Sequence, residues 1–398
     1  MKKYNRTKIA CYLGFITQAI TANFVPLLFL TFHREYGISL ERLAMISSVF
    51  FITQLIVDFL CVKLADRIGY RRSIIIAEVA AGTGLIMLAF LPDLLPDRYA
   101  GILVSTIIYA VGSGLIEVLC SPIIEACPFE NKAGMMSLLH SFYCWGSVAV
   151  VLISTIFFHL AGIGRWRIMA VLWALVPLFN VINFAVCPIL PINEEGSEGM
   201  KLSQLLKNKL FWLFVVLMIC AGACEIAMAQ WASTFVESAL GVDKTLGDLA
   251  GPCMFAVFMG ISRVMYSKYG EKWDLTIFMM ISGILCLISY LLAALSELNI
   301  MGLAGCVLCG FSVGIMWPGS ISISSKKLEG AGTALFAFLA LAGDCGGAIG
   351  PALVGAVSER CADNLKMGIL AGVVFPVTLT ICAFLLKSRS KKEAVMKR

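Results

Sequence analysis

Long apolar stretches constrain this chain more than any other feature of its sequence. A helix that crosses a lipid bilayer needs about 20 apolar residues, and stretches of that length follow one another along the chain, separated by short polar breaks. We place them near residues 9–31, 43–63, 73–91, 99–124, 137–159, 166–190, 210–239, 249–268, 274–296, 299–323, 331–357 and 365–387. The sequence therefore predicts an all-α polytopic membrane protein with about 12 transmembrane helices.

The composition agrees with a lipid environment. Hydrophobic residues make up 60% of the 398 residues and charged residues only 14%, which is far more apolar than a soluble core of this length needs. In a membrane protein the placement of Lys and Arg matters more than the net charge of +6, so nucleic acid is not an expected partner. The expected partner is the lipid bilayer.

The cysteines predict neither disulfides nor a metal centre. There are fifteen of them, an odd number, and most lie inside apolar stretches, where free thiols pack as small hydrophobic groups. Cys306 and Cys309 form a CxxC pair, but no second pair or histidine accompanies them. We therefore expect no metal and no cofactor.

The distribution of basic residues predicts the orientation. The first stretch follows Lys2, Lys3, Arg6 and Lys8, is longer than a signal-peptide core and has no small-residue cleavage site after it, so we interpret it as a retained helix. With the N-terminus in the cytoplasm, most of the 31 Lys and Arg residues fall on cytoplasmic segments. Both termini are therefore expected to be cytoplasmic in a cell membrane, with the bacterial inner membrane favoured.

A polar segment divides the chain into two halves. Residues 191–209 are rich in charges, Gly and Ser, and separate an N-terminal six-helix half, 1–190, from a C-terminal half, 210–387, which a basic tail, 388–398, follows. Arg67–Arg71 resembles Lys268–Lys272 at an offset of 201 residues, a weak internal repeat. Two related halves are typical of alternating-access transporters. Since one chain carries both halves, a monomer is expected to suffice.

The loop after the second stretch carries a family resemblance. It reads Val62-Lys-Leu-Ala-Asp-Arg-Ile-Gly-Tyr-Arg-Arg72, which resembles the signature G-x-L-A-D-R-x-G-R-[RK] of the major facilitator superfamily, with Val62 and Tyr70 as departures. Gly69 permits a tight turn there, and the basic residues hold the loop in the cytoplasm. The resemblance implies a secondary transporter with two six-helix halves, and gating by Asp66, Arg67, Gly69 and Arg71.

A second set of motifs is similar to the fucose:proton symporter branch and its sugar permease-like relatives. A Gly-rich helix segment, Gly112–Glu117, carries a membrane acid; Ser121-Pro122 follows, and His140 opens the next helix. Gly222–Glu225 running to Gln230-Trp231 also looks like that branch. The resemblance implies proton-coupled symport of a small polar solute, with a sugar-like solute favoured. Ser121 replaces the usual Asn, and the first stretch lacks the acid that fucose symporters carry.

Export is the alternative. The drug:proton antiporters carry a Gly-Pro motif in their fifth helix; here the nearest match, Gly346–Pro351, lies in the eleventh stretch. The many Phe, Met and Cys residues could line an adaptable pocket for amphipathic compounds, so proton-coupled efflux stays open. No nucleophile and base set is evident, and we expect no enzymatic activity and no catalytic residues.

Acids inside the membrane are costly and are candidates for function by default. Asp58 lies near Lys63, and Glu78 near Arg71 and Arg72, at the cytoplasmic side. We interpret both acids as pairing with these basic residues or snorkelling to the surface. Three acids lack such an explanation and are the candidates for proton coupling: Glu117, Glu225 and Asp344.

Glu117 is the first of these candidates. Tyr109, Ser113 and Ser121 lie at i−8, i−4 and i+4, on one helix stripe with it. A buried carboxyl disfavours its charged form and can load and release a proton as access alternates. The competing interpretation is a permanently protonated carboxyl in a structural hydrogen bond. The expected substrate-binding residues are Gln18, Asn23, Tyr109, Glu117, His140, Tyr143, Gln230, Trp231 and Trp317.

Overall fold

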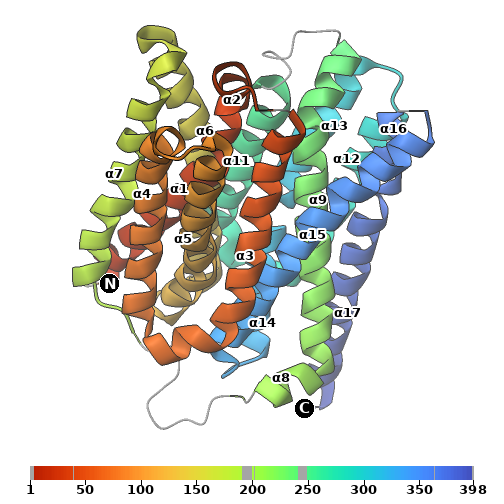
Figure 1. Cartoon of the computed structure of the whole chain (residues 1–398). Coiled ribbons are helices and arrows are strands. Elements are labelled where there is room, and N and C mark those ends of the chain that lie inside the picture. The colour runs from red at the N-terminus through yellow and green to blue at the C-terminus, as the bar shows by residue number, and fades with distance from the viewer. Residues whose placement is uncertain are drawn as a thin grey trace. The chain divides into compact units, whose positions relative to one another are not determined.

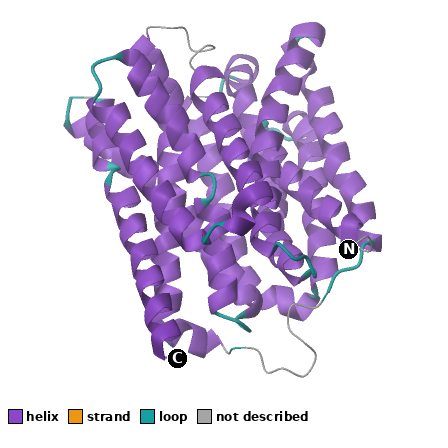
Figure 2. Ribbon diagram, turned by 180° about the vertical axis from the view of Figure 1, so that it is seen from behind, coloured by secondary structure: helices purple, strands orange, loops and turns teal. Residues whose placement is uncertain are grey.

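Helices account for nearly all of the regular structure (Figures 1 and 2). The computed structural model describes residues 4–38, 40–190, 200, 202–240, 249–362 and 364–396, and no strand occurs among them. The first six stretches correspond to α1 Asn5–Asn23 with η2 Val25–Leu28 and α2 Phe29–Tyr36, α3 Leu40–Ile68, α4 Tyr70–Leu94, α5 Arg98–Ala126, α6 Lys132–Ala161, and η3 Ile163–Arg165 with α7 Trp166–Val186. The other six correspond to α9 Lys209–Leu240, η4 Leu249–Cys253 with α11 Met254–Tyr269, η5 Gly270–Lys272 with α12 Leu275–Leu295, α13 Asn299–Val313 with α14 Met316–Lys327, α15 Gly332–Arg360, and α16 Leu365–Ala371 with α17 Val374–Met396.

These helices confirm the predicted all-α polytopic fold. Among the described residues, ten helical segments are long and apolar enough to cross a bilayer. The apolar part of α3, Met45–Cys61, is shorter, and α11 has 16 residues with Arg263 inside it. Each predicted stretch therefore corresponds to one helix or to consecutive helical segments, although two are less apolar than a typical span.

Several spans predicted as continuous helices are interrupted. The first breaks after Asn23, where the short 3₁₀ helix η2 carries Pro26; proline has no backbone N–H and its ring disturbs the preceding turn. The tenth breaks between Val313 and Met316. At that break Gly314 packs against Ser262 so closely that a Cβ would lie 2.7 Å from the Ser262 Cβ atom.

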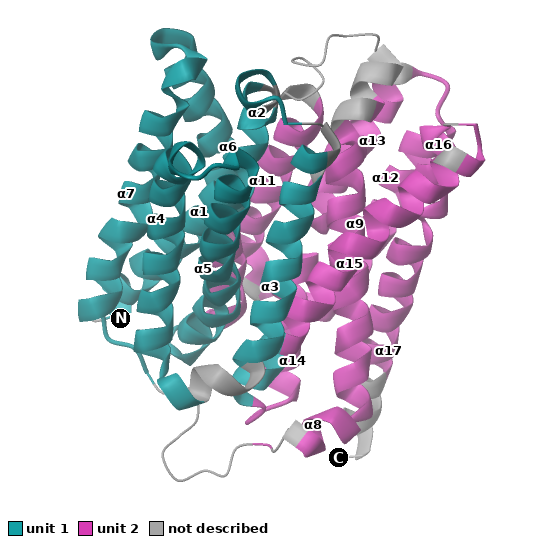
Figure 3. Cartoon of the chain, viewed as in Figure 1, with its two compact units in different colours: residues 1–130, 142–197, 332–337 teal, residues 131–141, 198–331, 338–398 magenta. Residues whose placement is uncertain are grey.

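The chain forms two compact units (Figure 3). Unit 1 comprises residues 1–130, 142–197 and 332–337, and unit 2 comprises residues 131–141, 198–331 and 338–398. α6 and α15 thus each contribute residues to both units. Of the predicted linker 191–209, residues 191–199 and 201 lie outside the described residues, and Leu202–Lys207 form the short helix α8.

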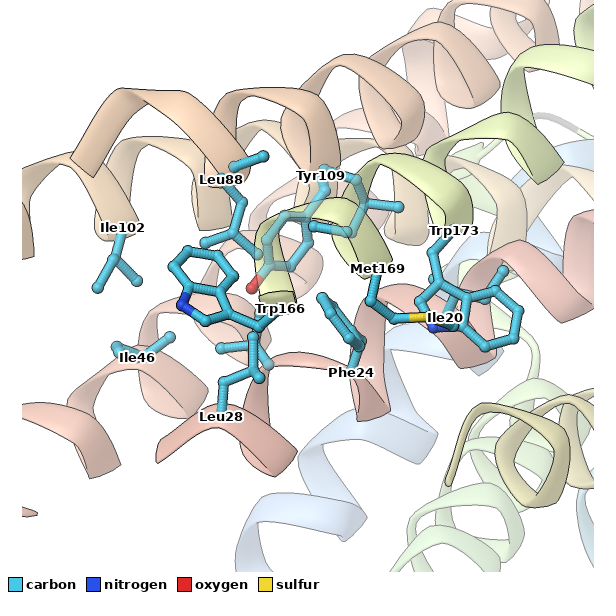
Figure 4. Packing of buried hydrophobic residues seen from close by; sticks show 14 of the residues in the cluster. Ile20, Phe24, Leu28, Ile46, Leu88, Ile102, Tyr109, Trp166, Met169 and Trp173 are labelled. Carbon is cyan, nitrogen blue, oxygen red and sulfur yellow. The ribbon is translucent and has the colours of Figure 1, made fainter. Parts of the chain in front are cut away.

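Unit 1 has a core of aromatic and aliphatic side chains. Phe24, Tyr109 and Trp166 lie in one cluster, each at most 1% exposed, with side chains from α1, α3, α4, α5 and α7 around them (Figure 4). The Tyr109 hydroxyl lies 3.0 Å from the Thr106 hydroxyl, in the same helix. Its polar atom is therefore satisfied inside this core.

In unit 2, α9 and α15 approach through small residues. A Cβ at Gly222 would overlap the Gly343 carbonyl oxygen, and one at Gly346 would overlap the Ile219 carbonyl oxygen. A Cβ at Gly350 would lie 2.7 Å from the Ala223 carbonyl oxygen. The glycines around Asp344 thus form a close helix crossing, as small residues commonly do in membranes.

This crossing predicts opposite results for two neighbouring substitutions. Gly346→Ala forces a methyl group against backbone that cannot rotate away, and overpacking of this kind costs about 1–3 kcal/mol. Gly347→Ala meets only side-chain atoms of Ile226, at 3.2 Å or more, which need to shift by a few tenths of an ångström, and it gains helix propensity of about 1 kcal/mol. Thermal melting of the purified variants should show a lower melting temperature for the first and an equal or higher one for the second. Equal melting temperatures would contradict the crossing.

The expectation of free thiols is confirmed. All fifteen cysteines are free, and twelve are buried. Cys253, Cys345 and Cys361 are the three with intermediate exposure. Most thiols therefore act as packing groups.

Candidate functional site

The central polar cluster of unit 1 joins three spanning helices. The Glu117 Oε2 atom of α5 accepts hydrogen bonds from Gln18 Nε2 of α1, at 2.7 Å, and from Gln54 Nε2 of α3, at 3.0 Å. Gln18 is 8% exposed and Gln54 3%, whereas Glu117 is half-buried. An amide–carboxyl cluster is thus held inside the helices, with its acid partly accessible.

Close helix packing brings Gln54 to the acid. A Cβ at Gly114 would lie 3.1 Å from Val57 Cγ1 and 3.4 Å from the Gln54 Cα atom, so the glycine lets α3 approach α5. The sequence analysis named Gln18 and Glu117 but missed Gln54. The signal that could have found it is an isolated amide in an apolar stretch, because such a group is costly in a membrane unless it has a partner.

Other predicted binding residues of unit 1 lie in different surroundings. Asn23 Nδ2 donates to Ser147 Oγ of α6, at 3.1 Å, and Ser147 Oγ donates to the Tyr143 carbonyl oxygen, at 2.9 Å. Asn23 and Ser147 thus form a second polar pair, to which Tyr143 contributes only its backbone carbonyl. Asn23 and Tyr143 are half-buried. Tyr109 is buried in the hydrophobic core, so its hydroxyl lies apart from the amide–carboxyl cluster.

The interpretation of Glu78 was wrong. Arg71 Nη1 and Nη2 donate to the carbonyl oxygens of Phe184, Ala185 and Cys187, at 2.7–2.8 Å. Glu78 is fully buried instead, and accepts from Asn180 Nδ2 of α7, at 2.7 Å, and from Thr17 Oγ1 of α1, at 3.1 Å. The carbonyls at the end of α7, which lack helical donors, attract the guanidinium.

Unit 2 contains a buried ion pair. Arg263 Nη2 of α11 lies 3.2 Å from Glu225 Oε2 of α9; Arg263 is 2% and Glu225 8% exposed. Arg263 Nη1 also donates to the His140 carbonyl oxygen, at 2.9 Å, and Nε to that of Gly314, at 2.8 Å. One guanidinium thus contacts three other chain segments, including the break between α13 and α14.

The remaining candidates of unit 2 are spread over several elements. His140 is 5% exposed, and Gln230 is exposed. Trp231 Nε1 donates to the Pro351 carbonyl oxygen, at 3.2 Å. The Trp317 ring packs on Gly343 so closely that a Cβ there would overlap it, and Asp344 is half-buried.

The predicted gating loop joins α3 to α4. Gly69 has φ +88°, a backbone conformation that favours glycine, which agrees with the tight turn expected there. Arg67 is exposed and Arg71 caps the end of α7. The side chain of Asp66 lies outside what the structure describes.

Known proteins resemble the chain over nearly its whole length. A putative niacin/nicotinamide transporter of Bacillus subtilis (strain 168) is 22% identical over 408 aligned residues, which cover 96% of this chain and 95% of that protein. The crystal structure of the Escherichia coli fucose:proton symporter FucP superposes with a TM-score of 0.79 at 15% identity, covering 96% and 99% of the two chains. That of the proton:xylose symporter XylE, bound to 6-bromo-6-deoxy-D-glucose, gives 0.82 at 13%, covering 97% and 96%.

The solved structures share the overall all-α polytopic fold of this chain. The sequence profile of the Major Facilitator Superfamily matches residues 10–351. The family and the relative's name make the protein a multi-pass membrane transporter rather than an enzyme. The chain belongs to the Major Facilitator Superfamily.

Proposed function

We propose that this transporter moves a small polar solute, with a sugar-like solute favoured, by proton-coupled symport. The observation that carries the proposal is the half-buried Glu117 carboxyl with its two amide donors, Gln18 and Gln54. A carboxylate only accepts hydrogen bonds, whereas a protonated carboxyl also donates one, and each amide offers both a donor and an acceptor. The cluster thus matches the hydroxyl groups of a polar solute and changes its hydrogen-bonding character with a single proton.

Proton coupling follows from the cost of charge inside the membrane. An ionised carboxyl that crosses the bilayer interior without a cation is unfavourable. Glu117 would therefore change access with its carboxyl protonated when the solute is bound, and the empty transporter would return with a carboxylate that the Gln18 and Gln54 amides stabilise by hydrogen bonds. We propose Glu225 and Asp344 as the secondary coupling candidates, although Glu225 already has Arg263 as a counter-ion.

The resemblances guide the choice of solutes. The two solved structures are of a fucose and a xylose symporter, and their likeness to this chain supports the fold. The relative from Bacillus subtilis is named for niacin and nicotinamide, which are small polar solutes of another kind. Both groups therefore belong in the first screen.

The proposal is tested in two stages. A thermal-shift screen of the purified protein against fucose, xylose, niacin, nicotinamide and amphipathic drugs should reveal a ligand, since binding to the folded state raises its stability. Proteoliposomes with an alkaline interior should then accumulate that compound, and an uncoupler should abolish the accumulation. Binding without accumulation under any proton gradient would reject symport.

The second candidate function is proton-coupled efflux of amphipathic compounds. The feature that favours it is the large number of Phe, Met and Cys residues in the sequence, which could line an adaptable pocket. A host lacking its own pumps should become drug-resistant when it produces the protein, if efflux is the function. If drug sensitivity is unchanged and the protein accumulates a sugar, efflux is rejected and symport is supported.

We also propose that the protein works as a monomer in the bacterial inner membrane, with both termini in the cytoplasm. The support is the distribution of basic residues and the presence of both units in one chain. Asp66, Arg67, Gly69 and Arg71 are proposed as gating residues. A reporter enzyme that is active only outside the cytoplasm should stay inactive when it is fused to the C-terminus, because the C-terminus is expected to be cytoplasmic.

A further inference from the structure

We infer that Glu78 is a second proton-binding site of this transporter, separate from Glu117 and linked to it through α1. Its participation in the transport cycle rests on the proposed function, but proton binding itself does not. The site lies between α1, α4 and α7, where Glu78 is fully buried.

The hydrogen-bond partners of Glu78 are neutral. Asn180 Nδ2 donates to Oε1 and the Thr17 hydroxyl lies 3.1 Å from Oε2. None of the ion pairs among the described residues involves Glu78. Glu225, by contrast, lies 3.2 Å from a guanidinium that stabilises its charged form. Of these two buried acids, Glu78 is therefore the better suited to take up a proton.

The geometry accommodates both protonation states. When Glu78 is ionised, Asn180 and Thr17 both donate to it. When a proton binds to Oε2, the new O–H can donate to the Thr17 oxygen, because a hydroxyl both donates and accepts. The Thr17 hydrogen can then turn to a carbonyl in the preceding helical turn, as threonines in helices do. The exchange needs only a hydroxyl rotation.

The titratable neighbours of Glu78 are few. On α1, Gly14 lies close enough that a Cβ would be 3.4 Å from Glu78 Oε1 and 3.0 Å from the Cys120 sulfur of α5. On α7, Asn180 also donates to the Ala10 carbonyl oxygen and accepts from Asn183. The one titratable side chain among these contacts is the buried thiol of Cys120.

Adjacent residues of α1 connect the two acids. The Thr17 hydroxyl donates a hydrogen bond to Glu78, and the amide of the next residue, Gln18, donates one to Glu117. A displacement of α1 that breaks one of these hydrogen bonds therefore strains the other. Because Glu78 is fully buried in this conformation, it can exchange its proton with water only after the surrounding helices α1, α4 and α7 separate. Proton occupancy of Glu78 is thus tied to the conformation of the unit.

Infrared difference spectroscopy tests the site without any solute. Purified protein in lipid is taken from alkaline to acidic pH, and the C=O stretch of newly protonated carboxyls is recorded. Glu78→Gln should remove one component of this band and Glu117→Gln a different one. Glu297→Gln, at an exposed acid, should leave both of these components in place. A spectrum of Glu78→Gln identical to that of the wild type would overturn the inference.

A second variant covers the case in which Glu78→Gln does not fold. Thr17→Val keeps the shape and leaves Glu78 in place, but removes the hydroxyl. Because the hydrogen bond that the hydroxyl donates to the carboxylate is stronger than the one it accepts from the protonated carboxyl, its loss should raise the midpoint of the Glu78 component by a measurable fraction of a pH unit. An unchanged midpoint would overturn the inference. Since no solute is used, a failed symport assay would leave this result intact, and a missing Glu78 component would leave the proposed function intact.

Discussion

Replacing Glu117 by Gln is expected to abolish proton-driven accumulation of the solute while solute exchange continues. The substitution keeps the size of the side chain and imitates the protonated acid, so the contacts with Gln18 and Gln54 can persist in altered form. One proton per solute supports about a tenfold gradient per pH unit, because one unit corresponds to about 1.4 kcal/mol. In the variant the accumulation ratio should fall to about one, since no proton is carried.

Proteoliposomes containing the ligand from the thermal-shift screen provide the measurement. Accumulation under an imposed pH gradient is compared with counterflow, in which labelled solute exchanges with unlabelled solute. Glu130→Gln is the matched control, because Glu130 is an exposed acid just beyond the end of α5, and should behave as the wild type. If Glu117→Gln still accumulates solute, coupling resides elsewhere, with Glu225 and Asp344 as the next residues to replace.

Replacing Arg263 by Ala is expected to cause a large loss of stability. The substitution leaves the Glu225 carboxylate buried without its cation. It also removes the hydrogen bonds that Arg263 donates to the carbonyl oxygens of His140 and Gly314. Removing one partner of a buried ion pair typically costs about 3–5 kcal/mol. For a membrane transporter, such a loss should appear as poor yield and a greatly lowered melting temperature in detergent.

An exposed arginine is the control for this experiment. Arg98 lies 4.0 Å from Asp93, and its side chain is 52% exposed, so Arg98→Ala should cost no more than about 1 kcal/mol. Tryptophan fluorescence during heating follows both variants. Similar melting temperatures for Arg263→Ala and the wild type would mean that the buried pair contributes little. Glu225→Gln should be milder than Arg263→Ala, since Gln keeps an oxygen that accepts from the guanidinium.

Hydrophobicity predicted the number and approximate limits of the helices but not their interruptions. Apolar length alone marks a span, so every predicted stretch contains a helix. The break in the tenth span depends on Gly314, whose carbonyl oxygen accepts from Arg263 some fifty residues away. The π-helical start of the eighth span, with Pro252, was likewise missed. Such interruptions depend on tertiary contacts that a hydropathy pattern does not contain.

The polar residues show a similar limit. The sequence identified Gln18, Glu117 and Glu225 as groups that a membrane would not tolerate without a role. Their partners come from other helices: Gln54 for Glu117, and Arg263 for Glu225. Glu78 was assigned to Arg71 because the two lie close in sequence, but the donors that bind it come from α1 and α7. Proximity along the chain is a poor guide to pairing between packed helices.

The burial of the cysteines has a practical consequence for studying motion in this protein. Site-specific attachment of fluorophores or spin labels normally requires a background without reactive thiols, and fifteen replacements would endanger a close-packed bundle. Here twelve of the thiols are buried, where a bulky maleimide or thiosulfonate reagent has little access. Replacing only Cys253, Cys345 and Cys361 should give a nearly silent background. Pairs of labels introduced on α1 and α4 could then report directly whether α1 moves when the pH changes.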